Sequence, residues 1–149
     1  MMRERIDAYV SGSEELVQSI SGLTHEQLHT RPSDGSWSIH QIVIHMLDSD
    51  LIASDRMKRI ACMDKPLLIG YDENGFLQLP GVTELCPFTA CDQFKKNRQF
   101  TATVLYRLPA SAWDRFGIHN ERGKVTLSEM LEMYIHHLEH HLDFLNKKR

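Results

Sequence analysis

The chain has 149 residues and a formal net charge of −3, so it has the size of one domain and no basic excess for nucleic acid or an anionic membrane. We expect a single domain over residues 1–149 that binds a small molecule, with no nucleic-acid or membrane partner. Three cysteines without a C-x-x-C pair argue against a disulfide framework and favour a reducing, cytoplasmic location. No apolar run is long enough to span a bilayer, and the charged N-terminus is unlike a signal peptide.

The first part of the chain predicts one helix followed by a turn region. Apolar residues recur with helical spacing over residues 6–20, and Gly22 is suited to the position just after the last helical turn. The segment 24–28 begins with a Thr-x-x-Gln capping box and predicts one short helical turn. The following RPSDGS, residues 31–36, is typical of a turn.

Three longer helices are expected over about residues 37–63, 89–108 and 126–146. Pro109 ends the second of these, and a Thr-x-x-Glu capping box opens the last. The segment 64–87 contains three prolines, three glycines and no periodicity, and a loop of that length can run back along a whole helix. Strand-like alternation is missing, so the expected fold class is all-α: a four-helix bundle with one long crossover between helices two and three.

The last helix contains the stretch YIHHLEHHLDFLNK, which has four histidines. On a helical wheel, His137 and His141 lie with the apolar residues, whereas His136 and His140 lie on the opposite side. The inward pair is spaced i, i+4, so both imidazoles can reach one metal ion. The alternative is that the two are polar core residues bonded to a neighbouring helix. We assign the outward pair to a solvated face.

Two histidines do not hold a metal tightly, so a third ligand must come from elsewhere in the chain. The candidates are the acids and the other histidines, which are His25, His29, His40, His45 and His119. On the helix that begins WSIHQIVIHMLDSD, a polar strip at i, i+4 and i+7 consists of Gln41, His45 and Asp48. Because this half of the helix is apolar nearly all round, periodicity does not decide whether His45 faces the inward pair.

Three stretches together resemble the DinB superfamily, and within it the YfiT-like branch: GSWSIHQIVIHMLDSD, the loop with YDENGF, and GKVTLSEMLEMYIHHLEHHLDFL. The resemblance covers nearly the whole chain. It implies a four-helix bundle with one long crossover and a divalent metal, zinc or nickel, held by three histidines. Carried over to this sequence, the ligands are His45, His137 and His141. The resemblance also implies a homodimer.

Three neutral imidazoles leave a metal ion its full charge and an open position, which is the ligand count of catalytic zinc. Such a site can hold a thiol as its thiolate, or it can lower the pKa of bound water for hydrolysis. The resemblance favours an enzyme that transfers a low-molecular-weight thiol to an electrophile. A metal-dependent hydrolase and a non-catalytic metal-binding protein of the stress response are the alternatives. Asp48 is the candidate catalytic residue, as a general base.

The sequence also offers candidates for the surroundings of the predicted site. Either Asp48 or Gln41 can bond the second nitrogen of His45, although Gln41 is equally placed to cap its helix from Ser38. Residues that can line the mouth of the site, or simply pack the crossover, are Tyr71, Asp72 and Phe76. We assign both tryptophans, Trp37 and Trp113, to packing. No function is expected for Cys62, Cys86 and Cys91.

Overall fold

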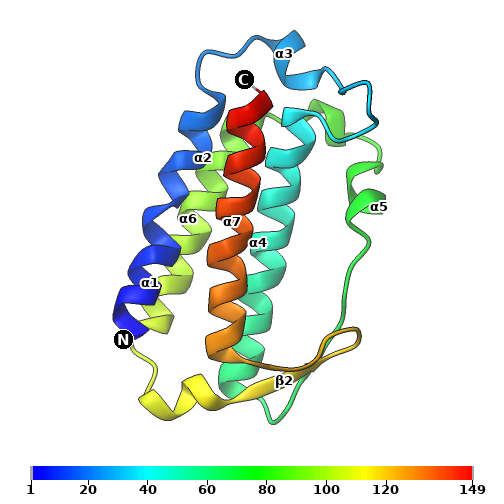
Figure 1. Ribbon diagram of the computed structural model, residues 1–149. Coiled ribbons are helices and arrows are strands. Elements are labelled where there is room, and N and C mark those ends of the chain that lie inside the picture. The colour runs from blue at the N-terminus through cyan, green and yellow to red at the C-terminus, as the bar shows by residue number, and fades with distance from the viewer. Residues whose placement is uncertain (1, 149) are drawn as a thin grey trace.

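A computed structural model describes residues 2–148, which form four long helical segments packed side by side (Figure 1). In chain order the elements are α1 (Met2–Ser11), α2 (Ser13–Ile20), α3 (His25–His29), α4 (Ile39–Cys62), β1 (Leu67–Leu68), α5 (Glu73–Leu77), the 3-10 helix η1 (Val82–Glu84), α6 (Pro87–Leu105), the 3-10 helix η2 (Ala110–Asp114), β2 (Phe116–His119), β3 (Gly123–Thr126) and α7 (Leu127–Lys148). The first segment consists of α1 and α2 end to end, and α4, α6 and α7 are the others. The predicted four-helix bundle is confirmed.

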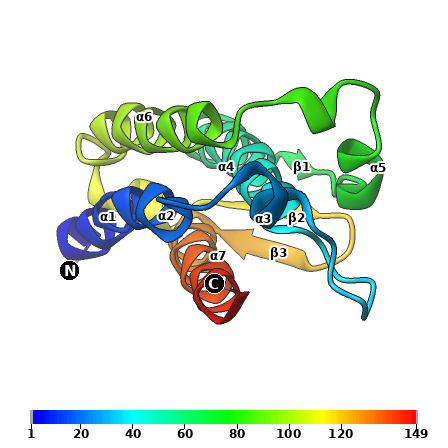
Figure 2. The same cartoon turned by 90° about the horizontal axis from the view of Figure 1, so that it is seen from above.

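The predicted long crossover is also confirmed. Figure 1 shows that α4 ends and α6 begins at opposite ends of the bundle, so the two helices run in the same direction. The chain between them travels the length of the bundle and contains β1, α5 and η1. The view from above places α5 on the outside of α4, away from α1 and α2 (Figure 2). The crossover therefore adds side chains to the outer side of α4.

The first predicted helix is divided in two at Gly12. A Cβ at this position would lie 2.9 Å from Cδ2 of Leu138 on α7, which is closer than real Cβ contacts. The missing side chain allows the first segment and α7 to approach each other closely. Periodicity did not predict this break, because the same apolar stripe continues across it.

Two capping boxes fix where α4 and α7 begin. The hydroxyl of Ser38 accepts the backbone N–H of Gln41 at 3.1 Å, and the Gln41 side chain accepts the N–H of Ser38 at 2.9 Å. Thr126 and Glu129 make the same reciprocal pair at 3.0 and 3.2 Å. Each box satisfies amide groups that have no partner within the helix. Both predicted helix starts are confirmed.

A small sheet at one end of the bundle was not expected from the sequence. Its strand order is β1-β2-β3, with β1 parallel to β2 and β2 antiparallel to β3. The longest of these strands have four residues, too few for an alternating pattern to be recognised. Gly117 permits the close approach of β1, because a Cβ there would lie 2.9 Å from the carbonyl oxygen of Pro66. The sheet places His119 at the end of β2, opposite Leu68.

The core contains one fully buried ion pair. The guanidinium of Arg98, on α6, donates to Oδ1 of Asp50 at 3.0 Å and to the carbonyl oxygens of Tyr9 and Tyr134 at 2.8 and 3.1 Å. It also lies over the rings of Tyr9 and Phe94. One side chain thus bonds to the first segment, α4 and α7 at once.

Across residues 2–148, no helix is both long and apolar enough to cross a membrane.

Candidate metal centre

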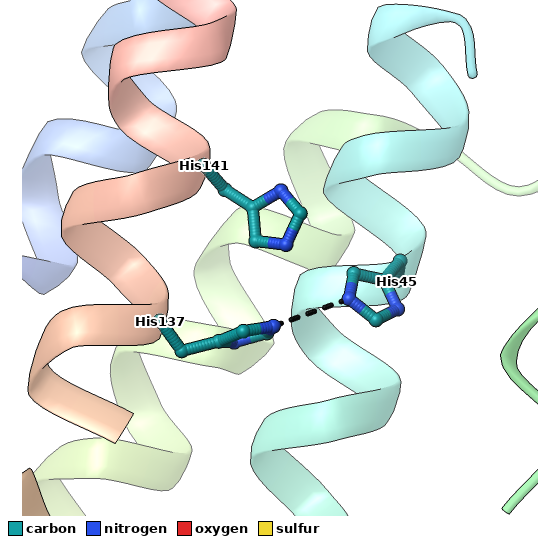
Figure 3. Close-up of side chains that lie close together, drawn as sticks. All are labelled: His45, His137 and His141. Carbon is teal, nitrogen blue, oxygen red and sulfur yellow. Dashed lines mark hydrogen bonds between the residues drawn. The ribbon is translucent and has the colours of Figure 1, made fainter. Parts of the chain in front are cut away.

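Three histidines from two helices meet between α4 and α7. His45 comes from α4, and His137 and His141 come from successive turns of α7. Each offers a ring nitrogen, and these nitrogens all lie within 4.8 Å of one another. Figure 3 shows the rings converging, with the Nε2 atoms of His45 and His137 3.2 Å apart. The structure therefore brings together the three residues expected as metal ligands, including the one whose direction periodicity left open.

The spacing of the ring nitrogens fits a metal ion. Two nitrogens each about 2.0–2.1 Å from a tetrahedral zinc ion would be about 3.3 Å apart, close to the separation of the two Nε2 atoms. Nδ1 of His141 is buried and has no hydrogen-bond partner, so the cluster is incompletely satisfied by protein groups alone. Within residues 2–148, no cysteine, aspartate or glutamate joins the cluster as a fourth ligand of this kind. This donor set is that of an open, catalytic type of site rather than a closed, structural one.

All three imidazoles are in the protonation state that binds metals. Burial lowers the pKa of His45 to about 4, that of His137 to about 3 and that of His141 to about 4. Repulsion from neighbouring histidines is the second contribution to each of these lowered pKa values. The rings are therefore neutral at pH 7, and protons do not compete for the ring nitrogens until the solution is acidic.

These lowered pKa values predict that the metal-free protein becomes less stable in acid. The unfolded chain takes up protons near the ordinary pKa of 6.5, whereas the folded cluster does so only near pH 3–4. The unfolded chain therefore binds more protons than the folded protein over this interval, so the free energy of unfolding decreases as the pH falls. After allowance for partial exposure, we expect a loss on the order of 1 kcal/mol per histidine between about pH 7 and about pH 5.

Urea unfolding of the metal-free protein at both pH values measures this loss. The His137→Asn variant should show a smaller pH dependence than the wild type, because it removes one of the three buried imidazoles. A wild-type free energy of unfolding that does not change over this range would contradict the assignment.

The second nitrogen of His45 faces two hydroxyl groups. Its Nδ1 lies 3.5 Å from both Oγ of Ser49 and the hydroxyl oxygen of Tyr71, and these two hydroxyls share a short hydrogen bond. A proton on Nδ1 pointing at this pair leaves Nε2 free for a metal. The candidates for this contact were Asp48 and Gln41, and of the two roles left open for Gln41 the structure shows the cap of α4 from Ser38.

Asp48 lies one turn beyond His45 and is half-buried. Burial raises the pKa of its carboxyl group; burial also raises the pKa of Tyr71, to which the charge of Asp48 adds a smaller contribution. The contacts made by Nδ1 of His45 are with Ser49 and Tyr71 rather than with Asp48. Its expected role as a general base stays a prediction.

The loop residues singled out from the sequence have three different roles. Tyr71 contacts the site through its hydroxyl, and Phe76 packs on the Tyr71 ring with a centroid distance of 4.9 Å. Asp72 caps α5 by accepting the N–H of Gly75, and its neighbours Tyr71 and Glu73 line the first of the cavities described below. Trp37 packs directly on the His45 ring, at a centroid distance of 4.7 Å, which periodicity could not show.

The other residues singled out from the sequence lie outside the histidine cluster. His136 and His140 are exposed, as expected for the outward side of α7. Trp113 is buried and belongs to the core. Two of the cysteines, Cys62 and Cys86, are exposed, and Cys91 is buried.

Two cavities adjoin the histidine cluster. The first, of about 490 Å³, has His137 in its wall together with Ser49, Tyr71, Arg56 and Tyr134. The second, of about 420 Å³, is lined by His141, Trp37, Ile42, Asn74 and Phe144. His140 lies at the edge of both. Either cavity is large enough for a small organic molecule.

Several residues of the first cavity were not predicted from the sequence. Arg56 and Tyr134 face each other across the α4–α7 contact, with Nη1 of Arg56 3.3 Å from the tyrosine hydroxyl. Ser49 is one turn from His45 on α4, so i, i+4 spacing was the one signal that could have indicated it. Arg56 carried no such signal, because an arginine within a helix is ordinarily a surface residue.

Comparison with known proteins identifies relatives along nearly the whole chain. A family model for the DinB superfamily matches residues 8–145. YfiT from Bacillus subtilis, provisionally assigned as a metal-dependent hydrolase, is 26% identical over 145 residues, covering 94% of this chain and 82% of that protein. A protein of Oceanobacillus iheyensis with the same provisional assignment is 25% identical over 139 residues, covering 93% and 78%.

Solved structures share the fold. The YfiT structure, described as an unusual four-helix bundle, matches with a TM-score of 0.92 at 23% identity, covering 98% of this chain and 84% of that one. A mycothiol-dependent maleylpyruvate isomerase matches with a TM-score of 0.76 at 13% identity, covering 97% and 60%. The family model, which spans the bundle and all three clustered histidines, leads to a plain conclusion: the chain belongs to the DinB superfamily.

Proposed function

We propose that this protein is a divalent-metal-dependent enzyme that transfers a low-molecular-weight thiol to a small electrophile. The observation that carries the proposal is the pair of cavities adjoining the histidine cluster. A transfer reaction needs room for two organic reactants at one centre, whereas hydrolysis needs room for one and a water molecule. The proposed metal is zinc or nickel, since imidazole nitrogens suit both.

The chain's own residues have defined parts in this proposal. A divalent ion bound there would lower the pKa of a thiol and hold it as a nucleophile at neutral pH. His45, His137 and His141 hold the ion, and the Ser49–Tyr71 pair keeps His45 turned with Nε2 inward. Burial raises the pKa of Tyr71 to about 12, so its hydroxyl keeps its proton at neutral pH.

A carboxylate near the centre matters less for thiol transfer than for hydrolysis. A hydrolase of this kind uses a general base beside the attacking water. The carboxylates that line the first cavity, among the described residues, are Glu73 and Glu121, and both are exposed. Asp48, with its raised pKa, is the candidate to accept a proton in either reaction.

Hydrolysis is the second candidate function, because YfiT and the Oceanobacillus protein are both provisionally assigned as metal-dependent hydrolases. The isomerase with a similar fold depends on mycothiol, a small thiol, which makes thiol chemistry compatible with this bundle. The expected homodimer stays a prediction, which sedimentation velocity would test.

One assay separates the two candidates. We expect zinc-loaded protein to accelerate conjugation of cysteine with chlorodinitrobenzene, and to hydrolyse nitrophenyl acetate at most weakly. His141→Ala should lose the conjugation activity, because it removes a ligand, and Asp48→Asn should lower it by about 10²-fold if Asp48 transfers a proton. Strong ester hydrolysis without conjugation would reverse the order of the two candidates.

A further inference from the structure

The first cavity contains a buried positive charge without an acidic partner. Arg56 is 7% exposed. Its two Nη groups donate to the hydroxyl of Tyr134 at 3.3 Å and to the carbonyl oxygen of Ile69 at 2.6 Å, both neutral groups. In the part of the chain that the structure describes, no carboxylate lies within ion-pair distance of this guanidinium.

A second buried arginine, Arg98, has a carboxylate partner. Arg98 is 0% exposed and is neutralised by Asp50 at 3.0 Å. Burying a charge without a counter-charge is strongly unfavourable, and charged side chains are almost never buried in proteins unless they are paired. Arg56 also lines a cavity, whereas Arg98 fills the core. The missing counter-charge of Arg56 can therefore be supplied by a ligand.

Other hydrogen-bond donors surround the same part of the cavity. Nδ1 of His119 accepts the backbone N–H groups of Glu121 and Arg122 at 3.0 and 3.2 Å, so the neutral ring carries its proton on Nε2 and can donate there. Tyr134 receives an N–H from Arg56 and keeps its own hydroxyl proton to donate. Buried donors beside a guanidinium form a site suited to an oxyanion, above all a carboxylate.

The arginines Arg56 and Arg122 and the glutamates Glu73 and Glu121 balance formally in the lining of the cavity, but the buried charge among them is the positive one of Arg56. Burial lowers the pKa of His119, and the positive charges of Arg56 and Arg122 lower it further against the opposing effect of Glu121. The carboxylates of Glu73 and Glu121 are on exposed residues, where solvent weakens their field. Arg56 is buried, so solvent screens its charge less than it screens the charges of the exposed glutamates.

The histidine cluster and Arg56 belong to one continuous site. Arg56 follows His45 by eleven residues on α4, which leaves the two about 20° apart around the helix and about 16 Å apart along it. Side chains on a helix lean toward its N-terminus, so Arg56 extends toward His45. His137 lines the same cavity as Arg56. A ligand with a carboxylate at one end could reach both.

We propose that the first cavity binds a small carboxylic acid, with its carboxylate on Arg56 and its other end at the histidine cluster. The acid is either the thiol itself or the electrophile that accepts it, and both of these identities rest on the proposed function. Arg56 is a specificity-determining residue in this assignment. It selects acids over neutral molecules of the same length.

The test compares matched probes on the zinc-loaded protein by titration calorimetry. Mercaptohexanoate and mercaptohexanol have the same thiol and chain length and differ only in the terminal group. We expect the acid to bind at least about tenfold more tightly than the alcohol, which is the effect of a charge-assisted hydrogen bond. Hexanoate, titrated into protein saturated with mercaptohexanol, tests whether the carboxylate belongs to the second reactant instead.

Arg56→Met should abolish the preference for the acid, and Arg56→Lys should retain part of it. Arg59→Met is the matched control, because Arg59 is exposed on the same helix and pairs with Asp55. If Arg56→Met does not fold, Tyr134→Phe can replace it. This change removes a hydroxyl donor beside Arg56 and should weaken binding of the acid but not of the alcohol.

The outcomes distinguish this inference from the proposed function. Arg56-dependent binding of hexanoate, with no binding of either thiol, keeps the carboxylate site and rejects thiol transfer. Binding of mercaptohexanol at the metal, with no Arg56-dependent gain for mercaptohexanoate or hexanoate, keeps the metal–thiol chemistry and overturns the carboxylate site. Equal binding of the acid and the alcohol by the wild type decides the second case at once, and a preference for the acid that persists in Arg56→Met decides it in the same way.

Discussion

Replacement of His137 or His141 by alanine is expected to weaken metal binding by at least about a hundredfold. Even an outer partner of a metal ligand typically contributes 10–100-fold to affinity, and a ligand itself contributes more. The wild type should contain about one divalent ion per chain after purification without a nickel column. Elemental analysis, followed by competition with a chromophoric chelator, measures both quantities.

The doubled histidines of α7 provide matched controls. His136→Ala and His140→Ala change the same residue type one position away, on exposed side chains, and should leave the metal content unchanged. Zinc should also raise the melting temperature of the wild type, since an ion that binds only the folded state stabilises it, and should not raise that of His137→Ala. A wild type that takes up no zinc or nickel would make the cluster a structural feature and remove the basis for enzymatic activity.

Asp50→Ala is expected to destabilise the protein by about 3–5 kcal/mol, because it leaves the guanidinium of Arg98 buried without a counter-charge. The two backbone carbonyls that Arg98 also reaches cannot neutralise it. Urea unfolding of the metal-free protein measures the loss.

Two further variants test the cause of this loss. The double variant Asp50→Leu with Arg98→Met should recover much of the stability, since apolar side chains can replace a buried pair. Asp55→Ala removes the carboxylate from an exposed i, i+4 pair with Arg59 and should cost at most about 0.5 kcal/mol. Equal losses for Asp50→Ala and Asp55→Ala would mean that the buried Asp50–Arg98 pair contributes no more to the free energy of unfolding than an exposed pair does.

The features that the sequence determined by itself are local ones. The boxes at Ser38 and Thr126 define helix starts through residues three positions apart; the one at Thr126 was predicted, and the one at Ser38 was one of two alternatives for Gln41. The inward direction of His137 and His141 follows from the apolar stripe of their own helix. The resemblance to a family added His45, which an apolar helix could not orient by itself.

The tertiary structure decided what depends on residues far apart in the chain. The Ser49–Tyr71 pair joins residues 22 positions apart, and Arg56 meets Tyr134 across 78 positions. Strands as short as β1 exist because β2 pairs with them, not because of their own pattern. A helical wheel gives the direction of a side chain but not what it meets, because that depends on how helices pack. The sequence therefore determined the bundle and two of its clustered histidines, whereas packing alone created the cavities and the unpaired charge of Arg56.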